Sequence, residues 1–214
     1  MLAYGFLTPW YRVSMKLLYS PISPFARMCR ITARELDLED ELEVVPIEGM
    51  SPAVPRADIV SHNPIGRIPT LITDHGHSIY DSRVICEYLT HHAGDKRLLP
   101  DEPVRRFRIL TLQALGQGIA EAAVALRYEL AARPEPARWQ QLMDRQRMRI
   151  LSACDDVEKR WTGELRDMTL ATIALAAALA YVNFRHGDLD WRSGRPILAR
   201  WFEEFSAKPS MKEG

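Results

Sequence analysis

Three short segments carry the side chains best suited to chemistry, and each stands where one predicted element meets the next. Ser23 precedes Pro24 in the pattern of a helix N-cap followed by a proline at the first helical position. Asp81 and Ser82 open another predicted helix, where backbone amides and a hydroxyl suit a carboxylate and an acidic side chain suits an ammonium. The pair Ile68–Pro69 begins a predicted strand. These residue types favour the binding of charged or peptide-like groups, although each is also common at caps and strand ends.

The cysteines and histidines do not suggest a metal or redox centre. Cys29, Cys86 and Cys154 are an odd number without a CxxC spacing, which argues against a disulfide framework, a zinc site or a dithiol pair. Cys29 and Cys86 fall inside predicted helices and are interpreted as small buried apolar side chains. No pair of histidines has the spacing of metal ligands. We therefore predict no metal and expect a reducing compartment.

The first half of the chain alternates short apolar runs with helical patterns. Met15 to Tyr19 is brief and bounded by proline, which predicts a buried strand, and a helix follows from Ser23 to Leu36. A strand–helix–strand order implies a parallel pair with a right-handed crossover. The further predicted strands are 42–45, 68–73 and 78–80, the last two flanking the turn 74–76, and a helix opens at Asp81. This order is the thioredoxin arrangement.

The second half contains only helical patterns. Residues 94–103 are polar, charged and bounded by glycine and proline, which is typical of a linker. The predicted helices cover 104–133, 137–165, 169–185 and 196–207. The expected architecture is therefore an α/β thioredoxin-like domain (15–93), a linker (94–103) and an all-α C-terminal domain (104–214).

Charge and hydropathy narrow the choice of partners. Lys plus Arg and Asp plus Glu both number 28, so the formal charge is zero and no basic field favours nucleic acid or an anionic membrane. The apolar stretch 168–184 is interpreted as a buried core helix rather than a membrane span. Residues 1–14 lack a basic n-region, so we expect no signal peptide and a cytoplasmic location, with Met15 as a hypothetical natural start.

At this point the chain resembles the glutathione S-transferase superfamily over nearly all of residues 15–211. The resemblance rests on Y-S-P-I-S-P-F-A-R at residues 19–27, N-P-I-G-R-I-P-T-L at 63–71, D-S-R-V-I-C-E-Y-L at 81–89 and a helical second half. The turn S-P-F-x-R and the sequence Asn183-Phe184-Arg185 are similar to a bacterial serine-type subgroup. The resemblance implies glutathione as co-substrate, a small electrophilic substrate and a homodimer.

The resemblance assigns catalysis to Ser23, whose hydroxyl would stabilise the glutathione thiolate. A thiol with a pKa near ~8.5 must fall by about 1.5 units to be half ionised at neutral pH, which requires roughly 2 kcal/mol. A hydroxyl donor to a charged sulfur supplies roughly 1.5–3 kcal/mol and a helix N-terminus about 0.3–1 kcal/mol. Tyr19 and Ser20 are alternatives for this role, while Arg27 is interpreted as structural.

Glutathione binding is assigned by the same resemblance to the other two segments. Pro69 would follow a cis peptide bond, so that the N–H and C=O of Ile68 pair with the cysteinyl backbone of glutathione. Asp81 and Ser82 would hold the γ-glutamyl end, and Arg67 the glycyl carboxylate. Phe25, together with Ile22, would lie beside the ligands, with the second substrate near Gln117, Glu121 and Arg127.

Two other functions fit the same fold. One is a glutathione-dependent thiol or peroxidase enzyme of omega or glutaredoxin type, which needs a cysteine where this chain has Ser23. The other is a non-catalytic interaction protein, as in the stringent-starvation proteins. One departure from the family is Thr172, where transferases usually have the aspartate of a Ser/Thr-x-x-Asp capping box, and we expect a slightly weaker helix start there.

Overall fold

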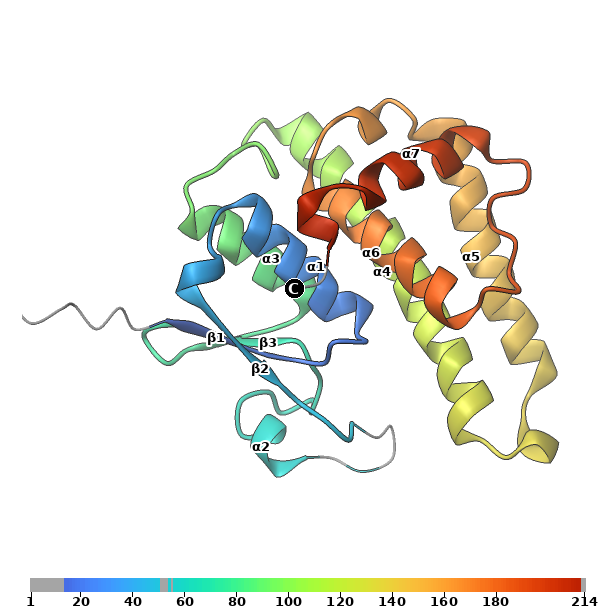
Figure 1. Cartoon of the computed structure of the whole chain (residues 1–214), viewed down its shortest axis with the longest axis horizontal. Coiled ribbons are helices and arrows are strands. Elements are labelled where there is room, and N and C mark those ends of the chain that lie inside the picture. Colours follow the sequence, from blue (N-terminus) through green and yellow to red (C-terminus); the bar gives the residue numbers. More distant parts are fainter. Residues whose placement is uncertain (1–13, 51–53, 55, 213–214) are drawn as a thin grey trace, which may run out of the picture.

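The computed structural model describes residues 14–212 except 51–53 and 55, and it has a small α/β part followed by a larger helical part (Figure 1). The hypothetical extension before Met15 lies almost wholly outside the described residues. The architecture is the thioredoxin-like domain plus all-α domain predicted from the sequence. The last helix of the first part, α3 (Ser82–His92), is followed by α4, which begins at Pro103.

The sheet has the mixed order β2-β1-β3-β4. Its strands are β1 (Met15–Tyr19), β2 (Leu42–Pro46), β3 (Thr70–Ile72) and β4 (Ser78–Ile79). β1 is parallel to β2 and antiparallel to β3, and β3 is antiparallel to β4. The parallel pair confirms the predicted crossover through a helix, here α1 (Pro24–Glu35). β3 and β4 are shorter than predicted, because the predicted ranges included residues of the loops at both ends.

Helices cover both faces of the sheet. α1 and α3 contact each other on the face toward the helical domain, and the short α2 (Ala57–Val60) lies on the opposite face (Figure 1). Ile59 of α2 is fully buried with Leu18 and Ile47, so this single turn closes the core of the far face. The sequence analysis missed α2 because one helical turn is too short for a periodicity of 3.6 residues to register.

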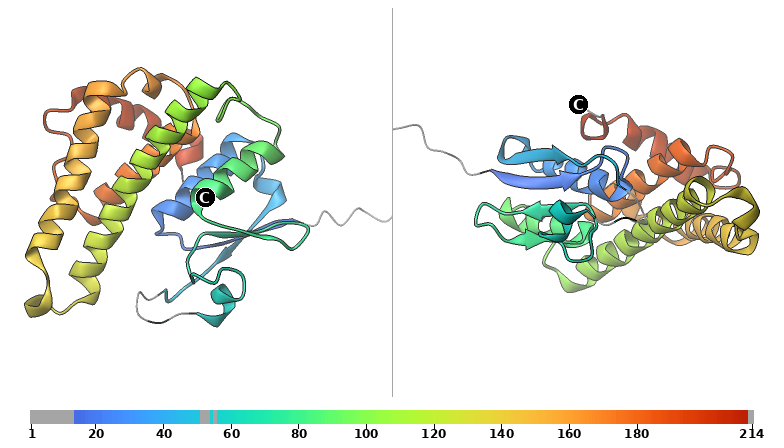
Figure 2. Two further views of the ribbon diagram at one scale, coloured as in Figure 1. Left: turned by 180° about the vertical axis from the view of Figure 1, so that it is seen from behind. Right: turned by 90° about the horizontal axis from the view of Figure 1, so that it is seen from below.

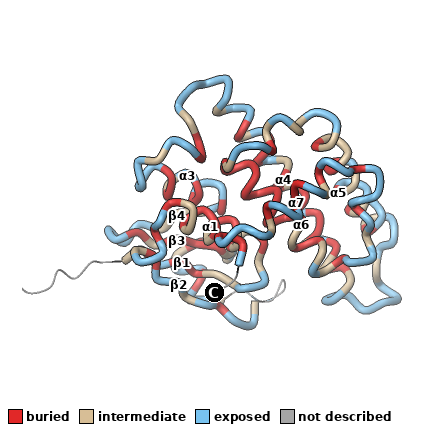
Figure 3. The backbone as a smooth tube through the Cα atoms, turned by 45° about the horizontal axis from the view of Figure 1, so that its top comes forward, coloured by how far each residue is buried: buried red, intermediate tan, exposed pale blue. Residues whose placement is uncertain are grey.

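The helical domain is built around α6, of whose 16 residues 12 are buried (Figure 3). Its helices are α4 (Pro103–Ala132), α5 (Gln140–Arg160), α6 (Leu170–Arg185) and α7 (Pro196–Ser206). α5 is shorter than the predicted 137–165, because 3-10 turns at Glu135–Ala137 and Glu164–Arg166 stand beyond its two ends. By length and composition α4 could cross a membrane, but 56% of its most apolar window is buried inside the protein, as in a core helix.

The crossing of α4 and α6 is unusually close at Gly116. A Cβ atom built on Gly116 would lie 2.8 Å from the backbone nitrogen of Leu175 and 3.0 Å from the carbonyl carbon of Ala174. A side chain at this position would therefore collide with backbone rather than with a mobile side chain. Only glycine permits the approach.

The start of α6 corrects one expectation. Thr169 is the N-cap, its hydroxyl accepts from the N–H of Thr172 at 3.4 Å, and the Thr172 hydroxyl accepts from the N–H of Thr169 at 2.9 Å. The capping box is thus complete without an aspartate, because a threonine hydroxyl at the third position accepts the same hydrogen bond. The expected weakening of this helix start was wrong.

The end of the described chain returns to α1. Arg27 donates to the carbonyl of Met211 at 2.9 Å, and Arg34 donates to the carbonyl of Ser210 at 3.2 Å and to that of Lys212. Met211 is buried against the core. Arg27 therefore has a structural contact, in agreement with its interpretation from the sequence, and the helix that begins next to Ser23 is held from both domains.

Candidate functional site

Ser23 caps α1 at the end of the turn that follows β1. Its backbone is extended, its hydroxyl accepts from the N–H of Ala26 at 3.3 Å, and Pro24 occupies the first helical position. An N-cap hydroxyl that accepts from the helix keeps its own hydrogen free to donate. The side chain is half-buried. The capping role and a role in stabilising an anion are thus compatible, because they use different parts of the hydroxyl group.

The peptide bond between Ile68 and Pro69 is cis, as the resemblance implies. The N–H and C=O of Ile68 make no hydrogen bond with any residue of the described part of the chain. Asn63 holds the loop ahead of it, donating to the carbonyl of Arg67 at 2.9 Å and to the hydroxyl of Thr70 at 3.2 Å. The backbone of Ile68 is therefore fixed in place with its polar groups available to a ligand.

The N-terminus of α3 combines a capping carboxylate with a buried hydroxyl. Asp81 accepts from the N–H of Arg83 at 3.0 Å and forms an ion pair with its guanidinium at 3.2 Å. The hydroxyl of Ser82, which is 1% exposed, donates to Gln117 of α4 at 3.4 Å. The N–H of Ser82 has no partner among the described residues. The helix thus offers a free amide and a half-exposed carboxylate, whereas the Ser82 hydroxyl is already engaged.

Sheet topology brings these three segments together. Because β1 and β3 are antiparallel with Leu18 opposite Thr70, the end of β1 lies beside the start of β3. β4 is antiparallel to β3 with Ile79 opposite Leu71, so the end of β4 lies at the same end of the sheet. The turn that carries Ser23, the loop of Ile68 and the start of α3 therefore meet at one end of the sheet, where β3 lies between β1 and β4.

The other residues predicted for the site lie near this end of the sheet. Phe25 is half-buried and packs against the main core, and Arg67 is exposed. Tyr19 is half-buried beneath the guanidinium of Arg30, which lies 5.2 Å from the ring centroid. Ser20 contributes a backbone carbonyl that accepts from the N–H of Ser23 at 3.0 Å. The two alternatives to Ser23 thus stand at the end of β1 and directly after it.

The cysteines behave as the sequence predicts, as buried apolar side chains. Cys29 is fully buried, and burial raises the pKa of its thiol well above the usual value. Cys86 is 1% exposed and accepts from the hydroxyl of Thr32 at 3.4 Å. A neutral, inaccessible thiol is a poor nucleophile. Among the described residues no group of three or more His, Cys, Asp or Glu side chains could hold a metal ion.

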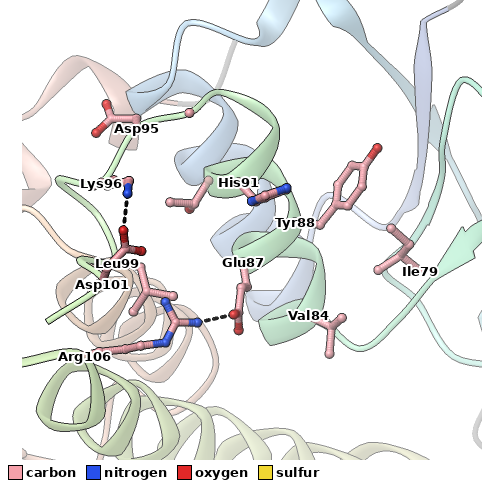
Figure 4. Close-up of a pocket in the computed structure, with 12 residues that line it drawn as sticks. Ile79, Val84, Glu87, Tyr88, His91, Asp95, Lys96, Leu99, Asp101 and Arg106 are labelled. Carbon is pink, nitrogen blue, oxygen red and sulfur yellow. Dashed lines mark hydrogen bonds and ion pairs between the residues drawn. The ribbon is translucent and has the colours of Figure 1, made fainter. Parts of the chain in front are cut away.

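A separate pocket of about 500 Å³ lies on the outer side of α3, between this helix and residues 94–106 (Figure 4). Tyr88 and His91 of α3 line it, and the ion pairs of Glu87 with Arg106 and of Lys96 with Asp101 join other residues of its lining. Its lining includes none of the three segments that carry the predicted site. The pocket is therefore a surface feature of the junction between the two domains.

Comparison with known proteins identifies the family. The glutathione S-transferase N-terminal domain model matches residues 22–92, and the C-terminal domain model matches residues 140–204. The chain belongs to the glutathione S-transferase superfamily. The uncharacterised GST-like protein YibF of Escherichia coli is 32% identical over 201 residues, which are 92% of this chain and 96% of that protein.

Solved structures of other transferases agree with this assignment. A glutathione transferase family member from Pseudomonas fluorescens with bound glutathione is 39% identical with a TM-score of 0.89, covering 92% of this chain and 97% of that one. A transferase from Methylobacillus flagellatus with glutathione bound is 33% identical with a TM-score of 0.80, covering the same shares. The transferase fold and a glutathione-type function of this chain rest on these similarities.

Two residues that support the site were not singled out for that role by the sequence. Asn63 was noted only as part of a motif, yet its buried amide holds the loop before Pro69. Gln117 was assigned to the second-substrate region, but it contacts Ser82 and donates to Glu121 at 3.4 Å. The signal for Asn63 was its place in an Asn-Pro turn, whereas the contact of Gln117 depends on how α4 packs against α3.

Proposed function

We propose that this transferase adds the thiolate of glutathione to a small electrophilic molecule, with Ser23 donating a hydrogen bond to the sulfur. The main support is that the Ser23 hydroxyl accepts a hydrogen bond from the N–H of Ala26 and so has its own hydrogen free, at the N-terminus of a 12-residue helix. A hydroxyl that accepts one hydrogen bond is polarised and donates the next more strongly. The donor and the helix dipole together match the roughly 2 kcal/mol that ionisation of the thiol requires.

In this proposal the backbone of Ile68 pairs with the cysteinyl residue of glutathione as an added strand beside Pro69. The free N–H of Ser82 takes the γ-glutamyl carboxylate, and Asp81 takes the ammonium. The Ser82 hydroxyl keeps its bond to Gln117, so its contribution is to orient α3 rather than to touch the ligand. Arg67 pairs with the glycyl carboxylate, and Phe25 packs beside the tripeptide.

The relatives support the ligand. The Pseudomonas transferase also has a structure with bound S-(propanoic acid)-glutathione, at 38% identity and a TM-score of 0.85. A thioether of glutathione is what an addition reaction at sulfur leaves behind. A redox function of omega or glutaredoxin type is disfavoured, because the nearest cysteine to the turn, Cys29, is fully buried with a raised pKa.

We also propose a cytoplasmic homodimer. Val84 of α3 and Val104 and Phe107 of α4 are 51%, 70% and 65% exposed, on two helices joined by the ion pair of Glu87 with Arg106. Exposed large apolar side chains on two adjoining helices favour a protein partner, and a second copy is the simplest one. Sedimentation analysis tests the proposal, with Phe107→Glu expected to give a monomer.

Calorimetry with reduced glutathione and steady-state kinetics with a chlorinated nitrobenzene test the function. Ser23→Ala is expected to lower turnover by at least about tenfold with little change in glutathione affinity, since only the charged sulfur gains from the donor. Ser23→Thr keeps the hydroxyl and serves as the matched control. Near-normal turnover in Ser23→Ala would transfer the role to Tyr19 or Ser20, which Tyr19→Phe and Ser20→Ala distinguish. Absence of glutathione binding at millimolar concentration would favour an interaction protein instead.

A further inference from the structure

The end of α6 is bound to the second half of α4. The ring nitrogen Nε2 of His186, the C-cap of α6, lies 2.8 Å from the carbonyl oxygen of Ala123. This contact places the last turn of α6 beside residues 123–128 of α4. Both helices contact α1, and in Figures 1 and 2 these two stretches stand beside the turn between β1 and α1. These stretches therefore belong to the part of the helical domain that lies nearest the turn of Ser23.

Two guanidiniums and two phenols meet there. Tyr181 of α6 is 7% exposed, and its hydroxyl accepts a hydrogen bond from Arg185 on its own helix and lies within electrostatic reach of Arg127 and Tyr128 on α4. Phe184, which is 60% exposed, carries the Arg185 guanidinium over its ring at 4.1 Å from the centroid. We call Arg127, Tyr128, Tyr181 and Arg185 the arginine–tyrosine cluster. Phe184 and Arg185 belong to the Asn-Phe-Arg sequence of the resemblance, which the proposed function leaves without a role.

The positive charge of this cluster is not balanced within the protein. In the first half of α4, three successive arginines each pair with a carboxylate: Arg105 with Asp167, Arg106 with Glu87 and Arg108 with Glu164. Arg127 and Arg185 have no such partner among the described residues, and the Nε atom of Arg185 is buried without any hydrogen bond.

The carboxylates near the cluster in the sequence do not pair with it: Glu129, two residues after Arg127, forms its ion pair with Arg133. Glu121 stands six residues before Arg127, about 9 Å along the helix axis, and accepts from Gln117. Asp188 is exposed and forms no ion pair with any residue of the described part of the chain, although its charge acts on His186. A buried guanidinium nitrogen that lacks an acceptor is costly unless a ligand provides one. An anionic group from outside the chain would supply an acceptor for the guanidinium of Arg185.

Resting on the proposed function, we propose that Arg127 and Arg185 bind a carboxylate of the second substrate, so that the enzyme selects small unsaturated acids. Paired guanidiniums recognise carboxylates through charge-assisted hydrogen bonds, and the exposed ring of Phe184 offers an apolar surface to the adjoining carbons. The phenols add donors at the same place. The substrate class is an α,β-unsaturated carboxylate.

The positive charge also serves the reaction. The thiolate sulfur forms a bond to the β-carbon, the electron pair of the double bond moves to the α-carbon, and that carbon takes a proton from solvent water. The proton of the thiol has left earlier to solvent, so the sum is addition of glutathione across the double bond. A free carboxylate resists this step because it repels the thiolate and the developing enolate. Two guanidiniums cancel both negative charges where they accumulate.

The test is calorimetry on the full chain with three probes: reduced glutathione, S-carboxyethyl-glutathione and its uncharged amide, S-carbamoylethyl-glutathione. The wild type is expected to bind the carboxylate at least about tenfold more tightly than the amide. Arg127→Gln and Arg185→Gln should each reduce this preference by about fivefold or more without changing the affinity for glutathione. Arg200→Gln removes the same charge from an exposed position on α7 and should leave every value unchanged.

The inference would be overturned if the wild type bound the carboxylate and the amide with equal affinity, or if the preference survived both arginine substitutions. In either case continued binding of glutathione would uphold the proposed function. Loss of glutathione binding itself would instead strike the proposed function. Since Arg185 is partly buried, Arg185→Lys is the second variant if the glutamine form does not fold, and it should retain part of the preference. Initial rates with acrylate and with acrylamide, each divided by its uncatalysed rate, give the same comparison in rate enhancement, and the wild type is expected to show the larger enhancement for acrylate.

Discussion

Replacing Gly116 by alanine tests how closely α4 and α6 must pack. The new methyl carbon would stand 2.8 Å from the nitrogen of Leu175, 3.0 Å from the carbonyl carbon of Ala174 and 3.1 Å from the Cα of Leu175. Ordinary carbon contacts need about 3.5–4.0 Å, so the helices must separate by roughly half an ångström or more. All three obstructing atoms belong to backbone, and no side-chain rotation relieves them. We expect Gly116→Ala to destabilise the protein.

Gly118 provides the matched control, because a Cβ atom there meets nothing within 4 Å. Both substitutions gain the same helix propensity, about 0.8–1.0 kcal/mol. Gly116→Ala alone incurs the overpacking cost of about 1–3 kcal/mol, and we expect the upper part of that range for backbone obstruction. The difference between the two variants removes the propensity gain and isolates the contact at about 3 kcal/mol. Gly118→Ala should be more stable than the wild type.

Urea unfolding followed by circular dichroism measures the free energy of unfolding of both variants, and thermal unfolding measures their Tm. For a chain of this size a change of 1 kcal/mol moves Tm by about 2–4 °C, so the two variants should differ by roughly 6–12 °C. An unaltered m-value would show that the same surface is exposed on unfolding. If Gly116→Ala proved as stable as Gly118→Ala, the close approach of α4 and α6 described here would be wrong.

Three further predictions concern single contacts. Burial lowers the pKa of His186 from its usual 6.5, so the unfolded chain binds the proton more readily than the folded one. The free energy of unfolding should therefore fall as the pH drops below about 6.5. In His186→Gln the free energy of unfolding should depend less on pH between about 5 and 7. Thr172→Val should cost about 1–2 kcal/mol in urea unfolding through loss of the capping box with Thr169, whereas Thr172→Ser should cost less. Asn63→Ala should raise KM for glutathione about fivefold or more while kcat changes little, because it releases the loop of Ile68; a change in kcat alone would contradict this.

Elements with strong local signals were predictable from the sequence. Met15 to Tyr19 matches β1 residue for residue, and Ser23 with Pro24 marks the start of α1 to the residue. The apolar periodicity located α4 and α6 because both are long. A proline-bounded apolar run and an N-cap serine are properties of a few neighbouring residues, so a single sequence is enough to recognise them.

Contacts between distant parts of the chain were not predictable. The bond from Ser82 to Gln117 spans 35 positions, and the one from His186 to Ala123 spans 63. Such pairs depend on how helices cross, which periodicity does not determine. The sequence analysis placed Arg127 near the second substrate, but nothing in it linked this residue to Arg185, because the relation exists only once α6 is laid across α4.

The contacts from α1 to the final residues bear on how the protein is made. Arg27 and Met211 are 184 positions apart, so at about 5–20 residues per second the ribosome needs roughly 10–40 s to produce the acceptor after its donor. During that interval the first domain can form its sheet, but α1 lacks its contacts with the final residues of the chain. The time needed for translation therefore sets when the first domain acquires all of its contacts. A fragment released before residue 209 should be bound by chaperones as an incomplete product.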